Sequence, residues 1–144
     1  MRRFGQAPRP GIRYITRPGA YALIRRGRSL LVTEQSSPWP EIQLPGGGID
    51  PGETPIEALQ REALEETGWR LRVLRKLGVY QRYTYMPDYG IEARKICHIY
   101  LCAPGLHLGP PSEPGHRAFW MDGLAAAEAL ASPGDAWYAA RALR

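Results

Sequence analysis

Cysteine and long apolar runs are both scarce in this chain of 144 residues, which has only two cysteines, Cys97 and Cys102. So few thiols exclude a small disulfide-stapled scaffold. The apolar runs are short, as in Ile99 to Ala103, whereas a transmembrane helix needs roughly 20 apolar residues. The residues after Met1-Arg2-Arg3 lack the apolar core of a secretion signal. We therefore expect a cytoplasmic protein that does not enter a membrane.

The two cysteines also do not pair with each other. They lie five positions apart in a stretch with the pattern of a single strand. An odd separation along a strand places two side chains on opposite faces, where no disulfide can join them. We expect two reduced, partly buried thiols.

Lysine is nearly absent, with two residues against 17 arginines, and 14 acidic residues leave a net charge of +5. The arginine excess is consistent with genome composition alone, and equally with attraction of phosphate-bearing ligands. The basic residues are scattered and do not gather with aromatic residues into a nucleic-acid platform. Nucleic-acid binding is therefore the weaker hypothesis.

The remaining composition is that of one globular domain, with 44% hydrophobic and 23% charged residues. Residues 1–11 are expected to form an N-terminal arm or an added edge strand, and residues 12–144 a single domain. Strands are predicted over residues 12–17, 19–25, 29–33, 42–44, 70–85, 92–103 and 117–121. Helices are predicted over residues 55–67, 124–130 and 136–143. Breaks are expected at Pro38-Trp39-Pro40, in the turn 87–90 and in the loop 104–115. This order predicts a mixed α/β sandwich.

The first predicted helix has clear end signals. Thr54 is the expected N-cap, Pro55 takes the first helical position, and Glu57 completes a capping box. Gly68 is the expected C-terminal stop. At 100° per residue, the apolar stripe of this helix consists of Ile56, Leu59 and Ala63.

Carboxylates gather in the same region, because six of the 14 acidic residues fall between Gly47 and Trp69. Glu62, Glu65 and Glu66 project from adjacent turns of one helical face, where like charges repel. A solvated surface is the ordinary explanation of such a face. The functional alternative is a site for a hard cation, since oxygen ligands favour Mg²⁺ or Mn²⁺ over Zn²⁺. Arg61 lies where it would orient these carboxylates.

The motif that separates these alternatives spans residues 47 to 69. It reads Gly47, five residues, Glu53, seven residues, and then Arg61-Glu62-Ala63-Leu64-Glu65-Glu66-Thr67-Gly68-Trp69. This string closely resembles the signature box of Nudix hydrolases, in which every charged position and both glycines match. The small departures are Ala63 and Trp69, at two positions that family members fill with other apolar residues.

The resemblance implies a fold and a reaction for about residues 12 to 143. Nudix domains are α/β/α sandwiches around a mixed β-sheet, and they cleave nucleoside diphosphate derivatives with Mg²⁺ or Mn²⁺. By this resemblance Glu62, Glu65 and Glu66 are metal ligands, together with the carbonyl of Gly46. Glu53 is an outer or direct ligand.

The general base remains open between two carboxylates. Some family members use a glutamate of the box, here Glu66, and others use one in the loop before the last strand, here Glu113. Arg61 and Glu53 complete the expected catalytic set.

Candidate substrate contacts are Arg25 and Arg28 at a hairpin tip and Tyr85 in the later hairpin. The favoured substrates are small-molecule nucleotides, namely nucleoside triphosphates or dinucleoside polyphosphates, followed by ADP-ribose or a nucleotide sugar. One alternative is a Nudix-like domain that senses a nucleotide without turnover. An RNA-binding or RNA-decapping role depends on the basic charge alone, and a homodimer is left open.

Overall fold

The computed structural model describes residues 1–36 and 40–144, so the predicted break at Pro38 and Trp39 lies outside the described residues. The elements follow one another as β1 (Arg2–Phe4), β2 (Ile15–Arg26), β3 (Ser29–Gln35), β4 (Glu41–Gln43), β5 (Gly46–Gly48), α1 (Pro55–Thr67), β6 (Trp69–Met86), β7 (Ile91–His107), β8 (His116–Asp122), α2 (Gly123–Ala129) and α3 (Pro133–Ala142). Each predicted strand and helix overlaps one of these elements.

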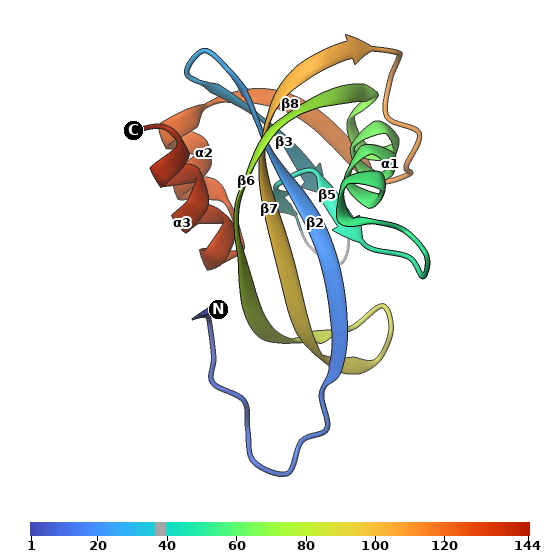
Figure 1. Cartoon of the computed structure of the whole chain (residues 1–144), viewed down its shortest axis with the longest axis vertical. Coiled ribbons are helices and arrows are strands. Elements are labelled where there is room, and N and C mark those ends of the chain that lie inside the picture. Colours follow the sequence, from blue (N-terminus) through green and yellow to red (C-terminus); the bar gives the residue numbers. More distant parts are fainter. Residues whose placement is uncertain (37–39) are drawn as a thin grey trace.

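The strands form one mixed sheet in the order β1-β6-β7-β2-β3-β4, with β5 paired to β2 and β8 paired to β3. The pairs β1·β6 and β2·β7 are parallel, and the other pairs are antiparallel. Helix α1 lies on one side of this sheet, and α2 and α3 lie on the other (Figure 1). The predicted α/β sandwich is confirmed.

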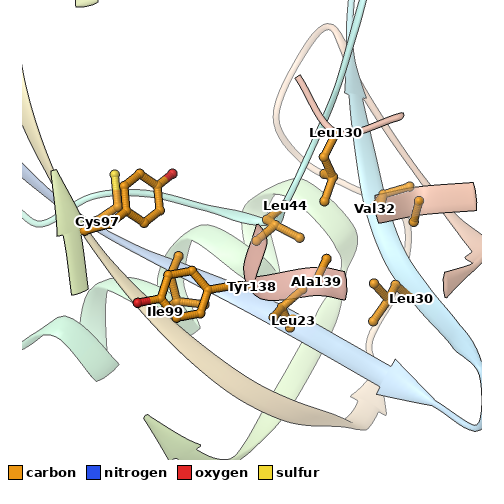
Figure 2. Packing of buried hydrophobic residues seen from close by; sticks show 11 residues of the cluster. Leu23, Leu30, Val32, Leu44, Cys97, Ile99, Leu130, Tyr138 and Ala139 are labelled. Carbon is orange, nitrogen blue, oxygen red and sulfur yellow. The ribbon is translucent and has the colours of Figure 1, made fainter. Parts of the chain in front are cut away.

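Each face of the sheet has its own apolar core. One core places Leu23 and Val32 of the sheet against Tyr138 and Ala139 of α3 (Figure 2). The other packs the α1 residues Leu59 and Ala63 against β2, β3 and β7. No described helix has the length and apolar character needed to cross a membrane.

The cysteines confirm the alternation that the sequence predicts for β7. Cys97 belongs to the core beside α3, whereas Cys102 belongs to the core beside α1. Both thiols are free and buried, on opposite faces of the sheet.

Two strand boundaries that were predicted at prolines are wrong, and α3 begins three residues before its predicted start, at Pro133. The strands predicted over 12–17 and 19–25 are one strand, β2, which continues through Pro18. Strand β7 likewise runs through Pro104 to His107, so the predicted loop starts later. A proline without an N–H is tolerated where one side of a strand is unpaired. The pairing of β2 with β5 begins only at Gly19, and that of β7 with β2 ends at Cys102.

Helix α1 has the predicted ends. The Thr54 hydroxyl accepts from the Glu57 amide, the Glu57 carboxylate accepts from the Thr54 amide, and Gly68 closes the helix with φ +77°. The predicted apolar stripe is wrong at Ile56, whose exposed fraction is 45%. The buried residues of α1 include Ala58 and Glu66, which shows that its buried face is rotated away from Ile56.

The N-terminal arm joins the sheet through β1, whose residues pair with Tyr80–Arg82 of β6. The Phe4 ring meets Tyr80 edge-on at 5.3 Å between centroids. Farther along the arm, Arg9 forms an ion pair of 2.7 Å with Glu92. The arm therefore covers part of the outer edge of β6.

Candidate active site

The glycine-rich strand β5 comes close to α1 because it carries no side chains. Gly46 has φ +144°, a conformation that side-chain-bearing residues rarely adopt. A Cβ atom on Gly47 would lie 2.6 Å from the carboxylate carbon of Glu62. The carboxylate of Glu62 therefore occupies the space that a side chain at position 47 would need.

Arg61 holds two of the box carboxylates in place. Its guanidinium donates to both oxygens of Glu53, at 2.8 and 2.9 Å, and to Glu62 at 2.9 Å. It also donates to the carbonyl of Gly48 at 3.1 Å. The hydrogen bonds from Arg61, followed by the one from the Asp50 amide, lower the pKa of Glu53 to about 2. Glu53 is thus a permanently charged partner of Arg61 and unsuited to accept a proton near neutral pH.

Three carboxylates converge beside this pair. One carboxylate oxygen from each of Glu62, Glu65 and Glu113 lies within 4.8 Å of the other two. These donors are all oxygens, and the side chains are half-buried, so water could remain on a bound ion. Such a donor set fits Mg²⁺ or Mn²⁺ better than Zn²⁺.

Glu113 reaches this cluster because its loop docks on the end of α1. The backbone amides of Ser112 and Glu113 both donate to the carbonyl oxygen of Glu65, at 2.8 and 3.0 Å. The structure therefore brings together the box carboxylates and the loop carboxylate that the sequence left as alternative bases.

Glu66 differs from the other box carboxylates in being buried, with an exposed fraction of 5%. Its carboxylate accepts from the backbone amide of Gly46 at 3.4 Å. Burial, followed by the negative charge of Glu62, raises the pKa of Glu66 to about 9. A cation beside it would favour the charged form and reverse that shift.

A cleft of about 340 Å³ opens from this acidic end. Gly46, Glu62, Glu66 and Glu113 line the acidic end, and other elements contribute Tyr21, Tyr80, Arg82, Lys95 and Asp135. Asp135 is buried, and the Tyr80 hydroxyl donates to it at 2.6 Å. The cleft thus combines an acidic end with basic and aromatic side chains.

The predicted substrate contacts lie in different places. Arg25 and Arg28 line a separate hollow of about 220 Å³ beside α2 and α3. Arg25 donates there to the carbonyls of Gly27 and Ala142, at 2.8 and 3.0 Å. The structure therefore does not bring these arginines to the acidic cleft. Tyr85 lines a neighbouring hollow that shares Lys95 and Arg82 with the cleft.

Sequence reasoning missed the cleft residues Lys95 and Asp135. Lys95 did leave a signal, because it alternates with Cys97 and Ile99 along one strand. A cation at that spacing lies on the apolar face of the sheet. Asp135 carried a weaker signal, as a lone acid at the start of an alanine-rich helix.

Comparison with known proteins gives a family model, described as NUDIX domain, that matches residues 15–141. A putative 8-oxo-dGTP diphosphatase from Bacillus subtilis is 41% identical over 70 residues, 49% of this chain and 47% of that protein. An RNA pyrophosphohydrolase from Helicobacter pylori is 73% identical over 26 residues, 18% of this chain and 17% of that protein. The chain thus matches less than half the length of these relatives.

Among solved structures, a NUDIX hydrolase from Nitrosomonas europaea has a TM-score of 0.71. The two sequences are 20% identical, and the match covers 89% of this chain and 90% of that one. At this identity the likeness shows a shared fold.

Proposed function

The chain belongs to the NUDIX domain family, and from this premise we propose that it hydrolyses the pyrophosphate bridge of a nucleoside diphosphate derivative. One observation carries the proposal: carboxylate oxygens of Glu62, Glu65 and Glu113 converge within 4.8 Å, and two of these residues, Glu62 and Glu113, line a cleft that also holds basic side chains. Opposite charges in one cleft suit a phosphate-bearing ligand and the cations that accompany it.

The proposed ligands of Mg²⁺ or Mn²⁺ are Glu62, Glu65 and Glu66, together with the carbonyl of Gly46. When bound, these ions would neutralise the pyrophosphate and make a coordinated water more acidic. Glu65 is the most accessible of the three proposed ligand carboxylates, with a side-chain exposed fraction of 39% against 17% for Glu62, whereas Glu66 is buried. Glu65 is therefore the clearest position at which to test the metal assignment.

We propose that Arg61 and Glu53 contribute by orienting the metal ligands. The fork of Arg61 fixes Glu53 and Glu62 relative to the carbonyl of Gly48, so the ligand set is formed before substrate enters. Outer partners of this kind orient ligands, and their loss weakens metal binding and activity.

Two carboxylates, Glu113 and Glu66, are the candidates for the base that accepts the proton of the attacking water. Glu113 stands beside Glu62 and Glu65 on a loop that is bonded to α1. Glu66 is buried and lines the same cleft as Glu113. Glu113 is our first candidate for the base, because it is the half-buried member of the pair and is open to the cleft.

The favoured substrates are nucleoside triphosphates and dinucleoside polyphosphates. The name of the Bacillus subtilis relative, an 8-oxo-dGTP diphosphatase, supports the first class. ADP-ribose and nucleotide sugars form the second group to test. The alternative function is a nucleotide sensor without turnover, which would bind the same ligands and release no product.

A nucleotide panel tests the proposal. Nucleoside triphosphates, dinucleoside polyphosphates, ADP-ribose and nucleotide sugars would each be incubated with Mg²⁺ and with Mn²⁺, and the products identified by mass. Glu65→Gln should lower turnover by orders of magnitude, whereas Glu128→Gln, which alters an exposed carboxylate on α2, should not. Binding of a nucleotide with no product from any of them would establish the sensor and overturn the hydrolase.

A further inference from the structure

Three cations form a row across the middle of the sheet. In the β2·β7 pair Arg17 is the register partner of Lys95, and in the β6·β7 pair Lys95 is the register partner of Arg82. Register partners on neighbouring strands point to the same face of a sheet. All three side chains therefore project on the face that carries Cys97 and Tyr80, towards the cleft.

No described carboxylate forms an ion pair with the row, and the nearby acid is the buried Asp135, whose charge acts on Lys95 and Arg82 from across the cleft. Among the residues that the structure describes, no carboxylate oxygen lies within 4.0 Å of the charged nitrogens of Arg17, Lys95 or Arg82. Aromatic rings are the neighbours instead: Arg17 lies 4.5 Å from the ring centroid of Tyr89, and the Lys95 ammonium lies 5.5 Å from that of Tyr21. Ring contacts hold cations without neutralising their charge.

Asp135 supplies at most one negative charge against the three positive charges of the row, so a further anion would stabilise it. Neighbouring strands lie about 4.8 Å apart, so the three cations are spaced closely enough to repel one another. All three are half-buried, which weakens the screening by water. Arg72, on the same strand as Arg82, is by contrast exposed and does not line the cleft.

The row also lies next to the glycine-rich strand. Arg17 and Lys95 line a hollow of about 240 Å³ together with Gly47, Gly48 and Glu62. Lys95 and Arg82 line the main cleft with Glu62 and Glu113. A ligand held at the acidic end can therefore extend onto the row.

We propose that Arg17, Lys95 and Arg82 form an anion subsite for a third phosphate of the substrate, one outside the pyrophosphate that is cleaved. The inference builds on the proposed function, because it assumes that the cleaved bridge lies at the acidic end. It also narrows the substrate class. Nucleoside triphosphates and dinucleoside polyphosphates carry a third phosphate, whereas ADP-ribose has only the two phosphates of its bridge.

Binding without metal tests the subsite separately from hydrolysis. Titration calorimetry in EDTA would compare inorganic triphosphate with pyrophosphate, on the full chain and its variants. The wild-type chain should prefer triphosphate, and Lys95→Gln or Arg82→Gln should weaken triphosphate binding by at least about tenfold, the usual scale for one charged hydrogen bond. Lys95→Arg, which keeps the charge, should restore most of the binding. Melting curves would confirm that each variant is folded.

Arg72→Gln removes the same charge elsewhere on β6 and should change binding by less than about twofold. An equal loss in Arg72→Gln would show general charge attraction and overturn the subsite. So would a wild-type chain without preference for triphosphate, or one whose preference survives both Lys95→Gln and Arg82→Gln.

The source of the third phosphate is distinguished with ATP and diadenosine tetraphosphate in the same titration. If the row holds a terminal phosphate, Lys95→Gln should lower the affinity for ATP more than that for diadenosine tetraphosphate. If the row holds an internal phosphate, the affinity for diadenosine tetraphosphate should fall more. Equal affinity of the wild-type chain for ADP-ribose and ATP would contradict the subsite. Triphosphate binding through the row in a chain that hydrolyses nothing would refute the proposed function alone.

Discussion

The backbone amide of Glu113 donates a hydrogen bond to the carbonyl oxygen of Glu65 at 3.0 Å, which joins the loop that carries the Glu113 carboxylate to helix α1. Carbonyls in the last turn of a helix have no partner within the helix. The loop before β8 supplies that partner, and Ser112 adds a second bond to the same oxygen at 2.8 Å. These two bonds hold the loop where the carboxylate of Glu113 lies beside those of Glu62 and Glu65.

Substitution of Glu113 by Gln should abolish most turnover and leave the fold intact. If Glu113 accepts the proton of water, kcat should fall by about 10²–10⁴-fold while nucleotide binding persists. The measurement is kcat and KM under saturating Mg²⁺, with Glu66→Gln in parallel. A Glu113→Gln enzyme that keeps wild-type kcat would assign the base to Glu66 or to another group.

Replacement of Arg61 by Lys should weaken metal binding, because a compact ammonium lacks the planar fork whose separate nitrogens reach Glu53 and Glu62 at once. Loss of such an outer partner typically costs about 10–100-fold in metal affinity or activity. Calorimetric titration with Mn²⁺ would measure this loss of metal affinity. Arg117→Lys, at an exposed ion pair with Glu34, is the matched control and should bind Mn²⁺ normally.

Glu53 should make folding stability depend on pH in the acid range. Arg61 holds the pKa of Glu53 at about 2, below the value of roughly 4.3 expected for an unfolded chain. A lowered pKa contributes stability that is complete above the unfolded value and is lost as the pH falls towards the folded value. Thermal unfolding of wild type and Glu53→Gln should therefore differ most above about pH 5 and converge as the pH falls from about 4.3 to about 2. A gap that stays constant with pH would show that the charge of Glu53 is not the cause.

The neighbouring glycines of β5 should respond differently to alanine. A Cβ on Gly47 would lie 2.6 Å from the carboxylate carbon of Glu62, so Gly47→Ala must displace that ligand. Gly48 has open space at the same position, and Gly48→Ala should retain activity and Mn²⁺ affinity. Calorimetry with Mn²⁺ and steady-state kinetics would compare the pair. Similar behaviour of the two variants would mean that Glu62 adjusts without loss.

Patterns that extend over only a few residues were enough to predict most of α1 and of the motif at residues 47–69. Thr54, Glu57 and Gly68 are recognised within a few residues of one another, and strand alternation placed Cys97 and Cys102 correctly. The rotated buried face of α1 was missed, because it depends on which sheet residues the helix meets.

The cleft residues depend on pairing between distant segments. Lys95 joins Arg17 and Arg82 only through the registers of two strand pairs, which a single sequence does not reveal. Arg25 and Arg28 were predicted from charge at a hairpin tip, and that tip lies beside α2 and α3, away from the acidic cleft. The charge of these two arginines could not show how far from the acidic cleft their hairpin tip would lie.

The short strand β1 matters for how the protein is prepared. It precedes the region 15–141 that matches the family, yet it pairs with Tyr80–Arg82, and Phe4 supports the ring of Tyr80. A version trimmed to the matched residues 15–141 would lose β1 and the Phe4 ring that packs behind Tyr80, a residue that lines the cleft. Ligand measurements therefore need a chain that keeps residues 1–14.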